Sequence, residues 1–200
     1  MIKIGQYNLL NVVKESAAGI YLDAGDFGEI LLLKDDATDQ RASKESCEVF
    51  LYYDSKEKVM ATTQRPYGCV GEFAFLKVVE ASPMGAFLDW GLPKDLFVPV
   101  REQQKLMEQG ERHIVYIYKD PQRNRLVASS RLNNYLNKEP AAYGENEKVG
   151  LLIAHETELG INAIVNHSHW GLLYRDEVFQ KLKYGQKIDG YVKKVRANNK

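Results

Sequence analysis

The chain has 200 residues, and its 27 Lys and Arg residues balance its 27 Asp and Glu residues, so the formal net charge is zero. With 44% hydrophobic residues this is a globular composition, which argues against a strongly basic nucleic-acid coat and an acidic disordered tail. No run approaches the roughly 18 apolar residues that a membrane span needs, the N-terminus lacks a signal-peptide pattern, and two cysteines make no disulfide framework. We therefore expect a cytoplasmic protein with no membrane partner.

An internal repeat of 66 residues organises the first part of the chain. It predicts one domain over residues 1–66 and a second over residues 67–132. The residues that recur at this offset are mostly glycines, namely Gly5 and Gly71, Gly19 and Gly85, and Gly25 and Gly91. Glycines at a fixed offset indicate a repeated backbone geometry, with positive φ or a close approach, rather than a repeated composition.

Each repeat has the pattern of an all-β domain. In the second repeat, short runs rich in Val, Ile, Phe and Tyr predict strands at FAFLKVV, GAFLD, LFVPV, IVYIY and RLVASS. A helical stretch, REQQKLMEQG, is predicted between the third and fourth strands. Five strands with a small helix in that place favour the OB-fold barrel, and an SH3-like barrel is the main alternative.

A third copy is predicted over residues 149–200, after a linker over residues 133–148 that begins with a short helix. We align VGLLIAHE with VGEFAFLK and NAIVN with GAFLD. No counterpart of the fifth strand follows the fourth, so the expected fold class is all-β, with three tandem five-stranded OB-fold barrels of which the third is incomplete. We expect the chain to be a fragment, or another segment or molecule to complete the last barrel.

Three motifs of the second repeat, GAFLDWG, DLFVPVRE and DPQRNRLVASSR, carry a family resemblance. They resemble the second strand, the end of the third strand and the last hairpin of the S1-like RNA-binding domain. Three tandem copies, with LPKDLFVP in the second, more specifically resemble the conserved virulence factor B family of bacteria. In that family three such barrels precede a winged-helix domain, of which no sequence is present here, and bind RNA. The resemblance implies a single-stranded RNA partner, no cofactor and a role in post-transcriptional gene regulation.

The resemblance also implies which residues face the RNA. Phe87 matches the second aromatic position of strand two, and Asp120 and Arg125 match an Asp–Arg pair of the last hairpin. Two positions depart from the family pattern, because Met84 replaces the first aromatic residue and Val98 replaces a histidine. In the third repeat we align Tyr174 with that histidine.

Aromatic and basic residues occur together in the second and third repeats, as stacking of bases and tracking of phosphates require. Trp90 lies in a turn, where we expect partial exposure. The candidate RNA contacts are Phe87, Trp90, Asp120, Arg123, Arg125, Trp170, Tyr174, Lys193 and Arg196. For every strand aromatic a core position is the alternative, since half of the side chains face inward, and Phe97 stays open between the two.

The net charge differs along the chain. It is −3 over residues 1–66, +1 over residues 67–132 and +2 over residues 133–200. The acidic first repeat, which has no aromatic–basic cluster, suits a protein partner. One alternative function is therefore a scaffold that docks onto the translation or transcription machinery, and another is an accessory module of an RNA-processing enzyme.

No spacing of residues indicates catalysis or a metal site. His167 and His169 form an H-x-H pair near His155, but zinc normally takes three or four ligands, and no cysteine lies nearby. Phosphate-binding loops, nucleophile elbows and dinucleotide fingerprints are absent from the sequence. We therefore expect a protein that is not an enzyme and that holds no metal.

Overall fold

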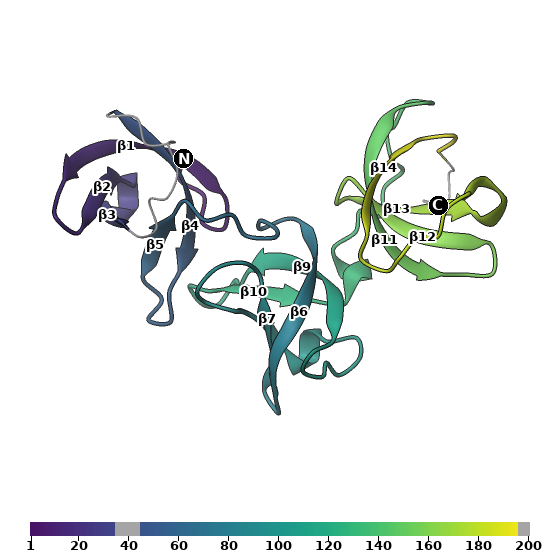
Figure 1. Cartoon of the computed structure of the whole chain (residues 1–200), viewed down its shortest axis with the longest axis horizontal. Helices are drawn as coiled ribbons and strands as arrows, with labels where there is room; N and C mark the ends of the chain where they lie inside the picture. The colour runs from purple at the N-terminus through teal and green to yellow at the C-terminus, as the bar shows by residue number, and fades with distance from the viewer. Residues whose placement is uncertain (35–44, 196–200) are drawn as a thin grey trace.

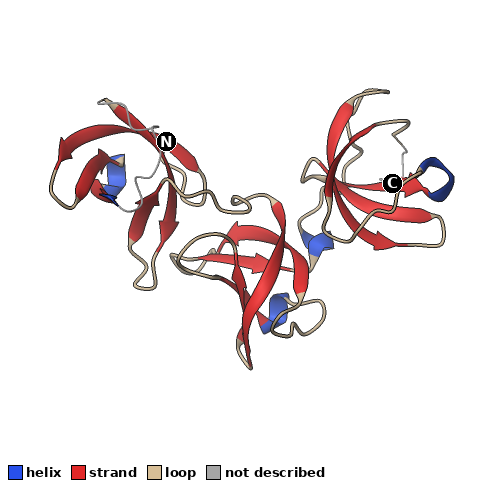
Figure 2. Cartoon of the chain, in the orientation of Figure 1, coloured by secondary structure: helices blue, strands red, loops and turns tan. Residues whose placement is uncertain are grey.

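The computed structural model describes residues 1–34 and 45–195, and every regular element in these ranges is a strand or a single turn of 3-10 helix (Figure 2). The chain forms three lobes in sequence order, and the second lobe lies at the vertex of an open V (Figure 1). The predicted all-β class with tandem five-stranded barrels is confirmed.

Barrel one is a five-stranded antiparallel sheet in the order β3-β2-β1-β4-β5. Its elements are β1 (Tyr7–Glu15), β2 (Gly19–Asp23), η1 (Gly25–Phe27), β3 (Glu29–Leu33), β4 (Ser46–Tyr53) and β5 (Val59–Thr62). The two edge strands, β3 and β5, lie against each other, so the sheet is nearly closed. Leu22, Leu32 and Leu51 are among the fully buried residues of its core.

Barrel two is closed, in the order β10-β8-β7-β6-β9. Its strands are β6 (Phe73–Ser82), β7 (Gly85–Asp89), β8 (Leu96–Pro99), β9 (Arg112–Lys119) and β10 (Leu126–Ser129). Closure comes from β10, which pairs antiparallel with β9 and parallel with β8. Alternate side chains point inward, so Leu76, Val78 and Leu88 fill the interior.

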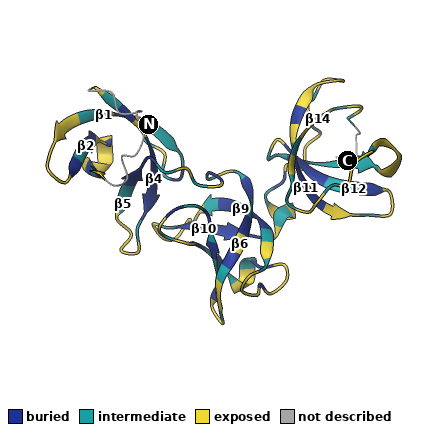
Figure 3. Cartoon of the chain, viewed as in Figure 1, coloured by how far each residue is buried: buried dark blue, intermediate teal, exposed yellow. Residues whose placement is uncertain are grey.

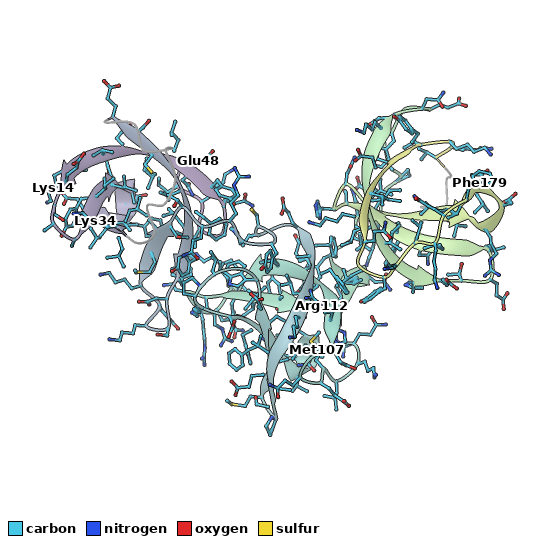
Figure 4. All side chains as sticks on the ribbon, in the orientation of Figure 1. Lys14, Lys34, Glu48, Met107, Arg112 and Phe179 are labelled. Atoms are coloured by element: carbon cyan, nitrogen blue, oxygen red, sulfur yellow. The ribbon has the colours of Figure 1, made fainter. Side chains whose placement is uncertain are left out.

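The helix predicted at REQQKLMEQG does not form, and only its start makes a 3-10 turn, η3 (Val100–Glu102). The reason is a buried side chain, Gln103, which replaces the backbone bonds of a helix. Its amide donates to the Val98 carbonyl at 3.1 Å and accepts the Met107 N–H at 3.0 Å. This loop directs Met107 into the core (Figure 4) and ends at Gly110, where φ is +90°.

Barrel three is a four-stranded sheet in the order β13-β12-β11-β14. Its elements are β11 (Lys148–Glu156), β12 (Gly160–Val165), β13 (His169–Tyr174), η5 (Arg175–Glu177) and β14 (Lys187–Tyr191). Within the described residues no fifth strand joins β13 to β14, in agreement with the incomplete third barrel that the sequence predicts. The short helix predicted at the start of the linker is one 3-10 turn, η4 (Leu132–Asn134).

The three barrels share cores at their joints. Strand β4 of barrel one is buried along most of its length (Figure 3), and its Phe50 belongs to the same cluster as Trp90 of barrel two. A second cluster joins Phe73 and Ile114 of barrel two to Leu152 of barrel three. The barrels are therefore packed against each other at both joints.

The hairpin between the first two strands recurs in every barrel and fixes their common register. In each hairpin a Ser or Thr precedes a glycine by three residues. Its hydroxyl donates a hydrogen bond to the carbonyl of that glycine, in the pairs Ser16 and Gly19, Ser82 and Gly85, and Thr157 and Gly160. All three glycines have φ between +152° and +157°. Gly160 is thus the counterpart of Gly85, and our alignment of NAIVN with GAFLD was wrong by two residues.

Candidate nucleic-acid interface

The outer face of β7 and β8 carries a pair of aromatic rings. Phe87 and Phe97 lie directly opposite each other across the two strands, with ring centroids 5.0 Å apart and planes inclined by 42°. Both rings are partly exposed, whereas the neighbouring Leu96 and Val98 are buried in the barrel. We call this pair the platform. Its rings offer aromatic surface to solvent on the strands that OB folds use for single-stranded ligands.

A guanidinium extends the platform at the Phe97 end. The Cζ atom of Arg125 lies 5.8 Å from the centroid of the Phe97 ring. Its Nε donates to Oδ2 of Asp120 at 2.8 Å, and Oδ1 of Asp120 accepts the Gln122 N–H at 2.9 Å. Burial disfavours the charged form of Asp120, but these hydrogen bonds together hold its pKa below the ordinary value. Asp120 is therefore an ionised, buried group that positions Arg125.

Trp90 does not belong to the exposed surface, and the expected partial exposure was wrong. Only 2% of the residue is exposed, because its ring packs edge-on against Phe50 of barrel one at 5.8 Å. Its indole N–H donates to the carbonyl of Lys94 at 2.6 Å. A ring enclosed on all sides cannot stack on a base, so its role is to join barrels one and two.

Arg123 lies at a hollow between two hairpins of different barrels. The hollow has a volume of about 450 Å³ and is lined by Lys119, Asp120, Pro121, Gln122, Arg123 and Asn124 of the β9–β10 hairpin, together with Glu57 of the β4–β5 hairpin. Asp120 thus contributes to both the hollow and the support of the platform. The structure therefore brings four predicted residues together, namely Phe87, Asp120, Arg123 and Arg125.

The candidates in barrel three do not form a second platform. By register, Asn162 opposite Leu172 occupies the place of Phe87 opposite Phe97. Trp170 is partly buried at the linker, where its indole N–H donates to Oδ1 of Asn133 at 2.8 Å. The aromatic residues of this barrel are therefore arranged differently from those of barrel two.

Our alignment of Tyr174 with the position of Val98 was wrong. Tyr174 pairs with Gly160 in the way that Pro99 pairs with Gly85. Val98 itself is fully buried, so a residue at its position faces the barrel interior.

Of the two basic candidates of barrel three, the structure describes Lys193, which follows β14. Lys193 forms a hydrogen-bonded ion pair with Glu177 of η5, and this bond raises the pKa of the lysine. Arg196 lies outside the described residues.

The sequence analysis did not decide whether Phe97 faces the core or the solvent, and it did not identify Lys94 as part of this region. The signal for Phe97 was present in LFVPV, because Leu96 and Val98 occupy the inward positions and leave Phe97 outward. Lys94 donates to the backbone carbonyl of Asp54 at 2.6 Å, and partial burial lowers its pKa. This contact joins two barrels, so no local pattern reveals it.

The histidines have hydrogen-bonding roles. His167 Nδ1 accepts the Phe73 N–H at 2.9 Å across the joint of barrels two and three, and His155 contacts Asn162 at 3.0 Å. In the described ranges no three His, Cys, Asp or Glu side chains are grouped so that they could hold a metal ion. Over the same ranges no helix is long and apolar enough to cross a membrane.

The barrels and the platform define an OB-type protein, and comparison with known proteins specifies the family. The S1 domain family matches residues 4–64 and 70–131. Because these segments make up more than half of the chain, the protein belongs to the S1 domain family.

Two further proteins are similar. The uncharacterized protein YitL of Bacillus subtilis (strain 168) is 33% identical over 95 residues, which are 47% of this chain and 32% of that protein. The chain thus spans about a third of the length of this relative. The crystal structure of a multidomain protein with nucleic acid binding domains from Streptococcus pneumoniae TIGR4 has a TM-score of 0.56 and 18% sequence identity, over 98% of this chain and 71% of that one. At this identity the likeness concerns the fold alone.

Proposed function

We propose that this chain binds single-stranded RNA without catalysing a reaction, and that barrel two supplies the main contact surface. The observation that carries the proposal is the platform of Phe87 and Phe97 with Arg125 beside it. Exposed aromatic rings stack on bases of any sequence, while an arginine pairs with phosphate through a planar fork of donors. A role in packing the barrel core explains neither why the two rings lie paired and partly exposed nor why a guanidinium lies beside them.

Membership of the S1 domain family and the fold of the streptococcal protein support binding of nucleic acid. The tandem arrangement and the LPKDLFVP motif favour the conserved virulence factor B family as the particular branch. On that basis we propose a cytoplasmic protein that acts in post-transcriptional gene regulation.

Titration of labelled single-stranded RNA at several salt concentrations tests the proposal. Loss of a stacked base costs about 1–3 kcal/mol, so we expect Phe87→Ala and Phe97→Ala each to weaken binding roughly 5- to 150-fold. Arg125→Ala should lower the slope of log affinity against log salt by about 0.7, the value for one phosphate contact on a single strand.

The matched control is Phe27→Ala, which removes a ring that is 44% exposed on η1 of barrel one. It should leave binding unchanged. Affinity that does not depend on salt, or that is indifferent to both platform rings, would contradict the proposed function.

A scaffold function is the second candidate, and one face of barrel one favours it. On β1 of that barrel Leu9 is 72% exposed and lies opposite Glu48 of β4. The corresponding face of barrel two carries Phe73, which is buried against barrel three. Protein partners that remain bound after nuclease treatment, and are lost in Leu9→Lys, would favour the scaffold over RNA binding.

A further inference from the structure

We propose that the hollow between the β4–β5 and β9–β10 hairpins binds phosphates of the RNA strand that lies on the platform, so that barrels one and two form one composite site. This inference rests on the proposed function. It gives barrel one, whose net charge is −3, a direct part in binding RNA.

Asp120 links the hollow to the platform. Asp120 lines the hollow and at the same time holds Arg125, whose guanidinium lies 5.8 Å from the Phe97 ring centroid. A strand that leaves the platform past Arg125 therefore meets the β9–β10 hairpin next. At about 450 Å³ the hollow has the size of a small-ligand site and accommodates a sugar–phosphate unit.

The two walls of the hollow are held in place by contacts between the barrels. The amino group of Lys94 donates to the Asp54 carbonyl in the β4–β5 hairpin at 2.6 Å. The amino group of Lys119, on the opposite wall, lies 5.6 Å from the centroid of the Tyr53 ring. Trp90 packs against Phe50 of β4 in the core that the two barrels share, so the joint that carries the hollow is fixed.

The lining of the hollow is balanced in charge, with Lys119 and Arg123 against Glu57 and Asp120. Elsewhere in the two hairpins and in the contact that joins them, Lys56, Lys58, Lys94 and Arg125 add to the cations and Asp54 adds to the acids.

Two of these acids already have hydrogen-bonding partners. Asp54 accepts the N–H groups of Lys56 and Lys58, and Asp120 accepts from Arg125. Across the part of the chain that the structure describes, Lys119 and Arg123 form no ion pair with a protein carboxylate. A phosphate of the RNA strand is an anion that these two side chains can bind.

Glu57 is the acid that opposes such a ligand. It lines the hollow from barrel one and also stabilises the charged form of Lys94 of barrel two. Changing its charge therefore changes the attraction of the hollow for phosphate while the platform stays untouched. Its place in an exposed hairpin also makes the substitution compatible with folding.

The test compares a ten-nucleotide RNA with a three-nucleotide RNA, which covers the platform alone. We expect Glu57→Lys to tighten binding of the longer strand about two- to fivefold and to steepen its salt dependence by about 0.7, with Glu57→Gln in between. Arg123→Ala and Lys119→Ala should weaken the longer strand by a similar factor. None of these variants should change binding of the three-nucleotide strand.

The matched control is Glu15→Lys, which makes the same change of charge on β1 of barrel one, away from the hollow. If it tightens binding as much as Glu57→Lys, the effect is one of net charge and the hollow is not a site. A polyglutamate peptide that competes as well as RNA of equal charge would also overturn the assignment to a strand.

Failure of this inference is distinguishable from failure of the proposed function. If the hollow variants leave both strands unaffected while Phe87→Ala weakens both, the composite site is wrong and the platform stands. If Phe87→Ala and Phe97→Ala also have no effect, the proposed function itself fails.

Discussion

At the scale of single residues, the platform depends on the absence of a side chain at Gly85. A Cβ atom there would lie 2.4 Å from the Val98 carbonyl oxygen and 2.7 Å from the ring of Phe97. Its φ of +157° is also one that residues with a side chain rarely adopt. The same glycine therefore allows the hairpin to form and the Phe97 ring to lie across it.

Gly85→Ala should destabilise the protein by about 1–3 kcal/mol, because the new methyl group clashes with backbone that cannot move away. RNA affinity should fall as well, since Phe97 must be displaced. Urea unfolding and RNA titration measure the two effects. The control is Gly144→Ala, where the nearest atom to the new methyl group is a carboxylate oxygen of Glu147 at 3.7 Å. Equal stability of the two variants would argue against the steric account.

The sequence predicts the outward position of Phe87 because the side chains of its strand alternate between core and solvent. It fails for Trp90 because the residue that buries Trp90 lies in another repeat. Phe87 lies between the buried Ala86 and Leu88, so local periodicity alone places it outside. Trp90 follows that strand in a turn, where local rules predict exposure. What buries it is Phe50 of the preceding repeat, a contact that no pattern within residues 67–132 contains.

At the scale of elements, the first hairpin of each barrel is a better guide to register than a fixed offset. The 66-residue repeat correctly predicts an unusual backbone conformation at six glycines. All of them have positive φ, namely Gly5, Gly19, Gly25, Gly71, Gly85 and Gly91. In barrel three, insertions move the equivalent glycine to Gly160, and alignment by apolar residues misses it. The Ser/Thr-x-x-Gly motif identifies it, because that motif is set by a hydrogen bond within the turn.

The turn between β12 and β13 joins barrel three to barrel two through His167. Asn166 and His167 both have positive φ, at 45° and 53°, and His167 Nδ1 accepts the Phe73 N–H. Burial lowers the pKa of His167, and Lys187 lowers it further, against an opposite effect of Glu72. The acceptor exists only while Nδ1 carries no proton.

Acid should therefore weaken this joint. Since folding depresses the pKa of His167, its contribution is fully present above the ordinary pKa of 6.5 and declines as pH falls below that value. We expect exchange protection of the Phe73 amide, corrected for intrinsic rate, to fall between pH 7 and 5 by about 1–2 kcal/mol.

His167→Asn should remove that pH dependence. An asparagine tolerates positive φ, and its Oδ1 keeps an acceptor for the Phe73 N–H. His155→Asn, on an exposed face of β11, is the control and should behave like the wild type. A Phe73 amide whose protection falls equally in His167→Asn would exclude His167 as the titrating group.

At the scale of the whole molecule, two shared cores turn three small barrels into a packed array. Barrel three has four strands in the described residues, and its buried Leu152 and Ile164 belong to the cluster that it shares with barrel two. Barrel one shares Phe50 and Tyr53 with barrel two. The acidic first repeat is thereby fixed beside the basic hairpin of the second, so the charge of one barrel acts on the ligand of the next.

Because Trp90 is buried in a core that two barrels share, its removal should destabilise both of them. Trp90→Ala leaves a large cavity, and we expect a loss of about 3–5 kcal/mol. Hydrogen exchange should accelerate in β4 of barrel one as well as in β7 of barrel two, while β12 of barrel three keeps its protection. Trp90→Phe is the matched control, since it keeps most of the packing against Phe50 and loses chiefly the bond to the Lys94 carbonyl, at about 1 kcal/mol. If β4 keeps its full protection in Trp90→Ala, barrels one and two fold independently, and the walls of the hollow are not held by a common core.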